Sequence, residues 1–367
     1  MAGDRGTFRI GKLPVDMLAR LVLSKKGRVR KEVVLHSSIG EDSCALDASG
    51  MLVVMSTDPI TGADEEIGWL SVHISCNDLA ANGAEPVGVL STILLPEGSR
   101  GRDLERLMNG IEAAADEIGV ELLGGHTEVT AAVRQVLVST TAVGLVARER
   151  LITKAGASPG DAMIMTKAAG LEGTAILAAD FADVLEPIVG KAVVEEARGF
   201  LKSISVVREG LVAAEAGATA MHDVTEGGIV GAAYEMAEAG SAGGRRLGFT
   251  IRLPEVPVRR ETAAICGVAG VDPLRIVSSG AMLIATPKAN ALEVVDVLRT
   301  AGVEAGVIGE FTCGPRVLVA GGTEFPVGPP ESDHIWAARE RLLSMRGGGA
   351  GRLRDGRPLS REGVTSR

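Results

Sequence analysis

SCNDLAANGAEP, Ser75–Pro86, is the stretch that decides the fold. The apolar residues before it, Ile67, Leu70 and Ile74, recur at near-helical spacing, and Asn82-Gly83 is a typical helix end. After Pro86 the chain continues as an apolar, β-branched run that is closed by a second proline. The stretch therefore predicts a helix that carries the polar pair Asn77-Asp78 and leads directly into a strand.

The same alternation of strand and helix signals extends outward on both sides of this stretch. The helix signal is clearest over Asp103–Gly119, where apolar residues form one stripe, an acidic residue opens the first turn and glycine ends the run. Strands are expected at Met51–Ser56, Val87–Leu95, Val120–Leu123 and Val136–Val146. The first half is therefore expected to be an α/β domain.

A small-residue and Pro/Gly stretch at Ala155–Gly160 marks a domain boundary, and a similar stretch at Gly240–Gly244 is interpreted as a flexible connection. We expect domains at 1–154 and 155–330, followed at 331–367 by a helical end and a Gly/Arg-rich tail that lacks apolar periodicity and is typical of disorder. The second domain is expected to be α+β. Its expected elements are strands at Ala162–Thr166, Met282–Thr286 and Val317–Val319, and helices after Gly170, at Ile229–Ala239 and at Ala291–Thr300.

Composition narrows the class of protein. The chain has 367 residues, more than one core usually holds, so two domains are the default. A net charge of -9 argues against a nucleic-acid partner, which would need a basic footprint. No apolar run reaches the roughly 20 residues needed to span a bilayer, no secretory leader is recognisable, and the four cysteines lack zinc-site spacing. We expect a cytoplasmic protein with reduced thiols and no membrane contact.

Four polar or glycine-rich clusters follow predicted strand ends or turns in the first half: Gly40–Ser43, Thr57-Asp58, Asn77-Asp78 and Gly124–Glu128. Mg²⁺ prefers oxygen ligands and shares them with phosphates, and glycines let backbone N–H groups approach phosphate oxygens. Taken singly, each cluster is better explained as a turn or a solvated helix residue. No Walker motif is present. Only the combination of the clusters favours a magnesium–phosphate site.

The order of these clusters, GEDS, STD, NDLAANGAEP and GGHTE, resembles the N-terminal half of the superfamily of aminoimidazole ribonucleotide synthetase and HypE. Thiamine-monophosphate kinase and selenophosphate synthetase also belong to that superfamily. In the second half, Pro159-Gly160-Asp161 and the stretch MHDVTEGG, Met221–Gly228, match as well. The resemblance covers about residues 10–320 and includes several motifs in family order.

The resemblance implies a fold and an activity. The N-terminal domain would be a PurM-like α/β half-barrel that pairs with a second copy, and the C-terminal domain would be α+β with a ferredoxin-like core. Family members bind ATP in a cleft between the domains near the dimer interface. Most transfer the γ-phosphoryl group to an oxygen, or to selenide, of a small second substrate. A homodimer and a maturation partner protein are the partners that follow from this resemblance.

The resemblance also assigns roles to residues. For magnesium it implies Asp42, Asp58, Asp78 and Glu128. For the nucleotide it implies Asn77, Gly124, Gly125 and Thr127, together with Lys12, for which a surface lysine is the stronger interpretation. For catalysis it implies His126, His222 and Asp223. An Asp78→Asn change is expected to weaken Mg²⁺-nucleotide binding and to leave stability almost unchanged.

Three departures from the family pattern leave alternatives open. Glu41 stands where the family often has aspartate. His126 replaces a carboxylate that the kinases and synthetases usually carry, and it is interpreted equally well as a phosphate contact, a base or a structural histidine. HypE ends in a reactive cysteine, whereas no cysteine follows Cys313 here. The leading hypothesis is an ATP-dependent phosphotransferase. A nucleotide-binding maturation or regulatory subunit without turnover is the alternative, and a true aminoimidazole ribonucleotide synthetase or thiamine-monophosphate kinase is weaker.

Overall fold

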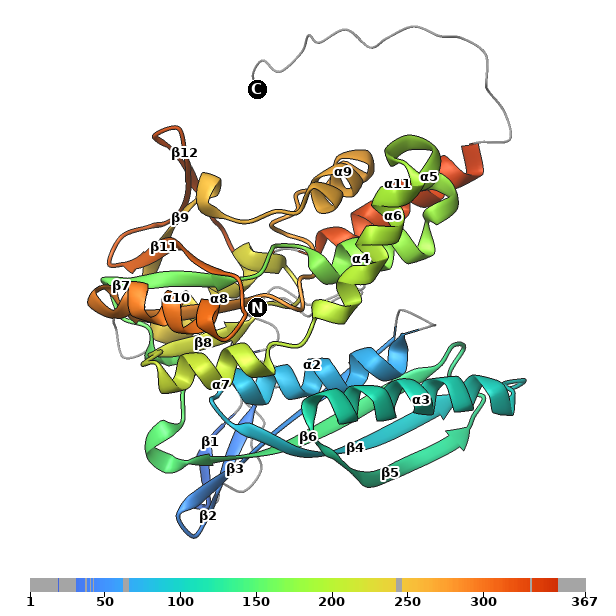
Figure 1. The fold of residues 1–367 in the computed structure, drawn as a ribbon, viewed down its shortest axis with the longest axis horizontal. Helices are drawn as coiled ribbons and strands as arrows, with labels where there is room; N and C mark the ends of the chain where they lie inside the picture. The colour runs from blue at the N-terminus through green and yellow to red at the C-terminus, as the bar shows by residue number, and fades with distance from the viewer. Residues whose placement is uncertain are drawn as a thin grey trace, which may run out of the picture.

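The computed structural model describes Ala19 and residues 31–36, 38–39, 41, 43–61, 66–241, 246–330 and 332–348. Two β-sheets organise these residues, one in each half of the chain (Figure 1). Lys12, Asp42, the part of the Gly240–Gly244 connection that follows Ser241 and the chain after residue 348 lie outside the described residues, so the predictions that concern them stay predictions.

The N-terminal sheet has six strands in the order β1-β2-β3-β6-β4-β5. Among these described strands only the pair β4–β5 is parallel, and the helix α3 connects these two strands, as a parallel pair requires. The bounds of the strands are β1 Val33–Leu35, β2 Cys44–Ala48, β3 Met51–Ile60, β4 Glu85–Leu95, β5 Glu121–Val129 and β6 Leu137–Ala147.

Two helices, α2 (Ile67–Ala81) and α3 (Gly101–Ile118), cover one face of this sheet, and among the described residues no helix covers the other, open face (Figure 1). The helix α3 is amphipathic and buries only the stripe that contains Leu107 and Ile111. Nearly every residue of α2 is buried, because the sheet lies on one side of it and the C-terminal half of the chain on the other. Polar residues on α2 must therefore find partners inside the protein.

The C-terminal sheet has seven strands in the order β13-β12-β9-β11-β7-β10-β8, antiparallel except for the pair β12–β9. A core of Met, Phe, Leu and Ile side chains fills the space between this sheet and α8. The strand bounds are β7 Asp161–Thr166, β8 Ala220–Asp223, β9 Gly248–Arg252, β10 Met282–Pro287, β11 Ala305–Thr312, β12 Arg316–Ala320 and β13 Thr323–Pro326.

The helices of this half fall into two groups: some cover the sheet, and others form a separate helical layer with their own apolar core (Figure 1). Their bounds are α4 Leu171–Asp180, α5 Ala182–Val189, α6 Lys191–Arg198, α7 Val207–Glu215, α8 Gly228–Gly240, α9 Arg260–Ala269, α10 Ala291–Thr300 and α11 His334–Gly348, with short 3-10 helices η2 Arg148–Arg150, η3 Lys154–Gly156, η4 Gly199–Ser203, η6 Leu253–Glu255 and η7 Lys288–Asn290. Within the described residues, every helix is too short or too polar to serve as a membrane span.

The two halves of the chain are joined through α2. Trp69 on α2 donates its indole N–H to the carbonyl oxygen of Leu201 at 3.0 Å. Asn77 binds the same segment twice, because its Nδ2 donates to the carbonyl oxygen of Ile204 at 2.8 Å and its Oδ1 accepts the N–H of Val206 at 2.8 Å. Lys167, which belongs to the C-terminal half like the segment itself, donates from its Nζ to the carbonyl oxygens of Ser203 and Ser205. The 203–206 segment is therefore held from both sides.

Replacing Asn77 with alanine should lower the free energy of unfolding by about 2–4 kcal/mol, because a buried main-chain N–H and a buried carbonyl would both lose their partner. Urea unfolding followed by circular dichroism measures this loss. The Asn77→Asp variant keeps the acceptor but places a buried carboxylate oxygen against the carbonyl oxygen of Ile204, so its loss should be at least as large. A loss below about 0.5 kcal/mol for Asn77→Ala would show that the clamp contributes nothing.

Candidate functional site

Two of the predicted carboxylates lie on the buried face of the N-terminal sheet. Side chains alternate along a strand, so Ser56 and Asp58 on β3 share a face. That face is the one α2 covers, because the Ser56 hydroxyl donates to Asp78 Oδ2 at 2.6 Å and Asp78 lies on α2. Asp58 follows Ser56 by two residues, so its Cα atom lies roughly 7 Å farther along the strand. Asp58 and Asp78 thus belong to the same helix–sheet layer, and their role as magnesium ligands stays a prediction.

The GGHTE stretch, by contrast, is not a loop. The prediction that the strand ends at Leu123 is wrong, because β5 continues through both glycines to Val129. Gly124 and Gly125 have φ values of 140° and 146°, which other residues rarely adopt. At Gly125 a Cβ atom would lie 2.0 Å from the carbonyl oxygen of Ser91. The glycines therefore let an edge strand pair closely with β4.

The strand β5 is separated from Asp58 and Asp78 in two ways: by distance across the sheet and by the face on which its side chains lie. Register pairs run across the sheet from Asp58 through Thr140 and Ser91 to Gly125, which is three strand spacings or about 14 Å. The Ser91 hydroxyl meets the Thr140 hydroxyl at 3.0 Å on the buried face. His126, next in sequence to Gly125, therefore belongs to the open face.

His126 and Glu128 face one another, with Nε2 and Oε2 3.3 Å apart, and their side chains are 65% and 49% exposed. Such exposure excludes a buried structural role for His126. It also corrects the expectation of one metal site containing Glu128, Asp58 and Asp78, because a single chain keeps Glu128 on the other face. Among the residues that the structure describes, no three His, Cys, Asp or Glu side chains form a metal-binding cluster.

The two predicted residues of β8 are both buried and lie in contact, with His222 Nδ1 3.6 Å from Asp223 Oδ1. His222 is 1% exposed, and its Nε2 lies 2.8 Å from Glu235 Oε2 on α8. Burial and the charge of Lys154 lower the pKa of His222, but its bonds with Asp223 and Glu235 outweigh them, so the net shift is upward. His222 is therefore inaccessible to a ligand, contrary to the expectation that it lines the cleft.

Two further charged residues in this region were not predicted. Lys154, on η3 between the two sheets, is almost fully buried. Its main-chain N–H donates to Glu41 Oε2 at 3.3 Å, and Asn82 Nδ2 donates to Glu41 Oε1 at 3.2 Å. The glutamate that stands where relatives often have aspartate thus bridges the end of α2 and the linker. Nothing in the sequence around Lys154 indicated burial.

A cavity of about 640 Å³ opens between the two halves of the chain. The end of β3, directly after Asp58, forms one wall with Pro59, Ile60 and Thr61. Residues of α4, the turn after β8 and α11 form the other wall; they include Glu172, Ile176, Asp180, Phe181, Glu226, Ile335, Trp336, Arg339, Leu343 and Arg346. The cavity therefore begins at the residue that follows Asp58 on β3.

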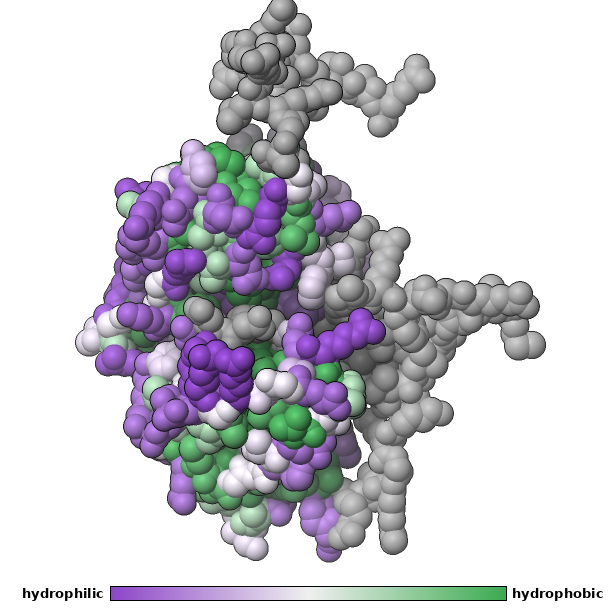
Figure 2. Space-filling view, turned by 90° about the vertical axis from the view of Figure 1, so that its right-hand side faces the viewer, coloured by the Kyte–Doolittle hydropathy of each residue, from purple (hydrophilic) through white to green (hydrophobic). Residues whose placement is uncertain are grey.

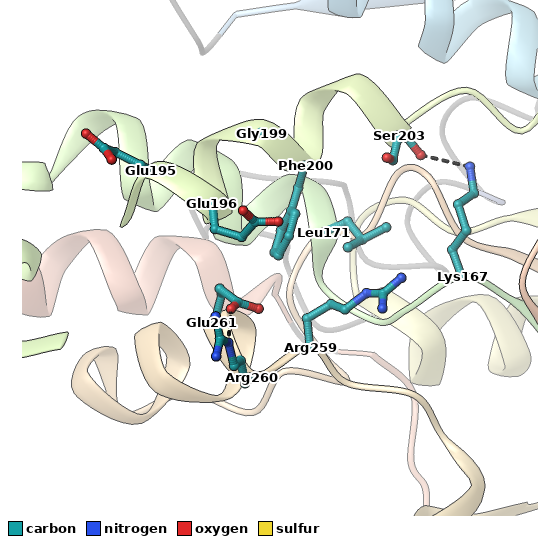
Figure 3. A pocket seen from close by; sticks show the side chains of 10 residues that line it. All are labelled: Lys167, Leu171, Glu195, Glu196, Gly199, Phe200, Ser203, Arg259, Arg260 and Glu261. Atoms are coloured by element: carbon teal, nitrogen blue, oxygen red, sulfur yellow. Dashed lines mark hydrogen bonds and ion pairs between the residues drawn. The ribbon is translucent and has the colours of Figure 1, made fainter. Parts of the chain in front are cut away.

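A second hollow, of about 520 Å³, lies wholly in the C-terminal half (Figure 3). It contains three cationic side chains, but each of them meets a carboxylate. Lys167 Nζ lies 2.6 Å from Glu209, Arg259 pairs with Glu304 at 2.7 Å, and Arg260 pairs with Glu261. Because these positive charges are matched within the chain, the hollow offers a weaker anion site than its composition suggests.

The most perturbed acid in the interdomain cavity is Glu172, in the first turn of α4. It is 6% exposed, and the N–H of Ser279 donates to its Oε2 at 3.2 Å. Burial raises the pKa of Glu172 to about 7; the Ser279 bonds oppose the shift, and the charges of Asp333 and Glu226 add to it. The one sequence signal that could have indicated Glu172 as a site residue is its place between Gly170 and Gly173, at the start of a predicted helix.

The Glu172→Gln variant should be more stable than the parent protein at pH 8 and equally stable near pH 4.5. A raised carboxyl pKa adds stability that is complete below about 4.5 and is lost as pH rises toward about 7. Glutamine mimics the protonated acid, so it avoids this loss, on the order of 2 kcal/mol. Denaturant titrations at both pH values measure the difference. Equal stabilities at pH 8 would contradict the raised pKa.

Comparison with known proteins agrees with this architecture. The family model described as "AIR synthase related protein, N-terminal domain" matches residues 40–146, and the corresponding C-terminal domain model matches residues 158–320. The carbamoyl dehydratases HypE of Cupriavidus necator and Rhizobium leguminosarum bv. viciae are 31% and 30% identical over 296 and 300 residues, each match covering 78% of this chain and 81% of the relative.

Among solved structures, hydrogenase maturation protein HypE in complex with ATP superposes with a TM-score of 0.64 at 23% identity, over 88% of this chain and 94% of that one. At this identity the match shows the fold alone, and it confirms the predicted two-domain arrangement of mixed α/β sheets. Because the two domain models together span most of the chain in the expected order, this protein belongs to the AIR synthase related protein family.

Proposed function

We propose that this protein is an enzyme that transfers the γ-phosphoryl group of ATP, with Mg²⁺, to an oxygen of a small molecule bound between its two domains. The observation that carries the proposal is that Asp58 and Asp78 share one helix–sheet layer and that Asp58 directly precedes Pro59, which lines the 640 Å³ cavity. The similar carbamoyl dehydratases and the ATP complex of HypE support the choice of nucleotide.

The donor set fits magnesium. Mg²⁺ usually takes one or two carboxylates and completes its shell with water and phosphate oxygens. Asp58 and Asp78 supply two carboxylates, and the Ser56 hydroxyl fixes the orientation of the second. Bound there, the ion would neutralise the charge that the triphosphate carries. Asp42 belongs to the same predicted set.

The protein's own work in this reaction is positioning. Transfer forms a bond between the substrate oxygen and the γ-phosphorus and breaks the bond to the bridging oxygen, which leaves with ADP. The clamp of Asn77 and Lys167 on segment 203–206 fixes the two domains around the reactants. His222, held by Glu235, acts as a positioning residue for the Asp223 carboxylate.

The open face of the N-terminal sheet supports a homodimer. Met51, Leu90 and Leu145 point to that face and are each about 40% exposed. Figure 2, a side view, shows hydrophobic residues among polar ones in the lower half of the molecule, the half that holds this sheet. Antiparallel sheets tolerate a solvated face only when it is polar, so this one needs a cover. A second copy would also offer its own His126 and Glu128.

Sedimentation tests whether two copies associate through this face. Leu90→Glu places a charge within the exposed apolar surface, so this variant should sediment as a monomer at concentrations at which the parent protein sediments as a dimer. The Glu97→Gln variant, a change outside this apolar surface, should leave the dimer intact. A parent protein that sediments as a monomer throughout would contradict the homodimer.

Calorimetric titration with ATP and Mg²⁺ decides the proposal as a whole. We expect saturable binding that disappears when the metal is chelated, and ADP release when the right second substrate is supplied. No binding would remove the basis of the proposal. Binding without turnover across a panel of metabolites would favour a nucleotide-binding maturation subunit instead.

A further inference from the structure

The interdomain cavity has a wall whose chemistry differs from that of a phosphate site. Its cationic side chains on α11 are directed at aspartates of the opposite helices: Arg339 pairs with Asp180 and Arg346 with Asp183. Both guanidinium groups also lie over the Phe181 ring, 5.7 Å and 4.7 Å from its centroid. These arginines therefore build the wall rather than attract an anion.

The polar group that this wall presents is the Glu172 carboxyl. Its position is fixed, because Ser279 binds it at 3.2 Å and the start of α4 follows Gly170. Asp333, held by the N–H groups of Gly227 at 2.6 Å and Ile335 at 2.7 Å, and Glu226 in the turn after β8 add negative charge nearby. Keeping such a group buried costs stability, so a ligand that pairs with it would remove a cost the empty cavity carries.

On the same wall of the cavity, α11 exposes an aromatic surface. Trp336 lines the cavity and remains 38% exposed, although its neighbour Ile335 is buried in the helical core. Leu343, about two turns farther along the same helix, extends the apolar surface. A flat indole ring and a fixed carboxyl that line the same 640 Å³ cavity match a planar ligand whose edge carries N–H groups.

We propose that this part of the cavity is the subsite for the second substrate, and that it takes a planar nitrogen compound, protonated or rich in N–H donors, which stacks on Trp336 and donates to Glu172. This inference rests on the proposed phosphoryl transfer and adds the substrate class to it. A flat aromatic cation gains from the indole face and from the carboxylate at the same time, whereas an aromatic anion of the same size meets Glu172 and Glu226 with like charge.

Ligand-observed NMR titration tests the subsite with 4-aminopyridinium, a planar cation with an exocyclic amine, and with benzoate as the anionic counterpart. The full chain should bind 4-aminopyridinium saturably in the millimolar range and benzoate at least about tenfold more weakly. The Glu172→Gln variant should lose about tenfold in affinity for the cation, as loss of one charged hydrogen bond implies.

Variants of α11 separate stacking from folding. Trp336→Ala should lose about tenfold in affinity for 4-aminopyridinium, whereas Trp336→Phe, which keeps a ring, should stay within about threefold. Glu340→Gln removes a charge from the exposed side of the same helix and should change nothing. Equal binding of benzoate, or unchanged affinity in both Glu172→Gln and Trp336→Ala, would overturn the subsite.

Titration with ATP and Mg²⁺ on the same preparation distinguishes the two proposals. In one outcome the nucleotide binds, but the protein shows no preference for 4-aminopyridinium over benzoate and no loss of affinity in the variants. In that case only the subsite is wrong. If 4-aminopyridinium binds as described but the nucleotide does not, the phosphoryl-transfer proposal is wrong and the cavity remains a site for nitrogen compounds.

Discussion

The Asp78→Asn variant should hydrolyse ATP at least about 100-fold more slowly than the parent protein, because it removes one of the two described carboxylates that would hold Mg²⁺ against the phosphates. Asparagine keeps the size of the side chain and can still accept the Ser56 hydroxyl through its amide oxygen. The change is therefore one of charge and not of shape. Rates of ADP release at saturating Mg²⁺ measure the effect.

A matched variant separates the metal role from the packing role. Ser56→Ala removes the bond to Asp78 and leaves the carboxylate, so activity should fall by less than about tenfold. Raising the Mg²⁺ concentration should restore part of the rate in Ser56→Ala and little of it in Asp78→Asn. Equal rates in Asp78→Asn and the parent protein would show that the carboxylate has no part in the reaction.

The structure also changes one expectation for this residue. From the sequence, Asp78→Asn was expected to leave stability almost unchanged. Asp78 is in fact 5% exposed and accepts a hydrogen bond from Ser56 at 2.6 Å. Exchanging a charge-assisted hydrogen bond for a neutral one in a buried layer should change the free energy of unfolding by about 1 kcal/mol. Stability must therefore be measured beside activity for this variant.

The Gly125→Ala variant should lower the free energy of unfolding by about 3 kcal/mol or more, among the largest losses a single methyl group can cause. The new Cβ would lie 2.0 Å from the Ser91 carbonyl oxygen, so β5 could keep its pairing with β4 only if one backbone moved. The φ of 146° at this position adds strain. Denaturant unfolding measures the loss.

The neighbouring glycine is the control for this prediction. Gly124 has a similar φ of 140°, but no atom lies within 4 Å of a Cβ built there. Gly124→Ala should therefore carry only the conformational strain, about 1–2 kcal/mol. If both variants lost the same stability, close strand pairing would not be the reason for glycine at 125.

The sequence predicts an element well when consecutive residues determine it, and poorly when pairing with a distant strand does. The helix predicted at Ala291–Thr300 is confirmed at the same residues as α10, and Asp103–Gly119 corresponds to α3 at Gly101–Ile118. Both have an apolar stripe that local spacing reveals. The end of β5 was predicted wrongly because consecutive glycines normally indicate a turn, and only pairing with β4 keeps them extended.

The sequence by itself determined the two-domain α/β architecture and the family, because hydrophobic periodicity and the order of polar motifs are properties of consecutive residues. The magnesium role of Asp58 and Asp78 stays a prediction. Only the tertiary structure decided which of these residues share a face, that His126 and Glu128 stand three strands away, and that Glu172 and Trp336 line one cavity. Strand register and the packing of α2 between the two halves bring together residues more than a hundred positions apart, and no local pattern encodes those distances.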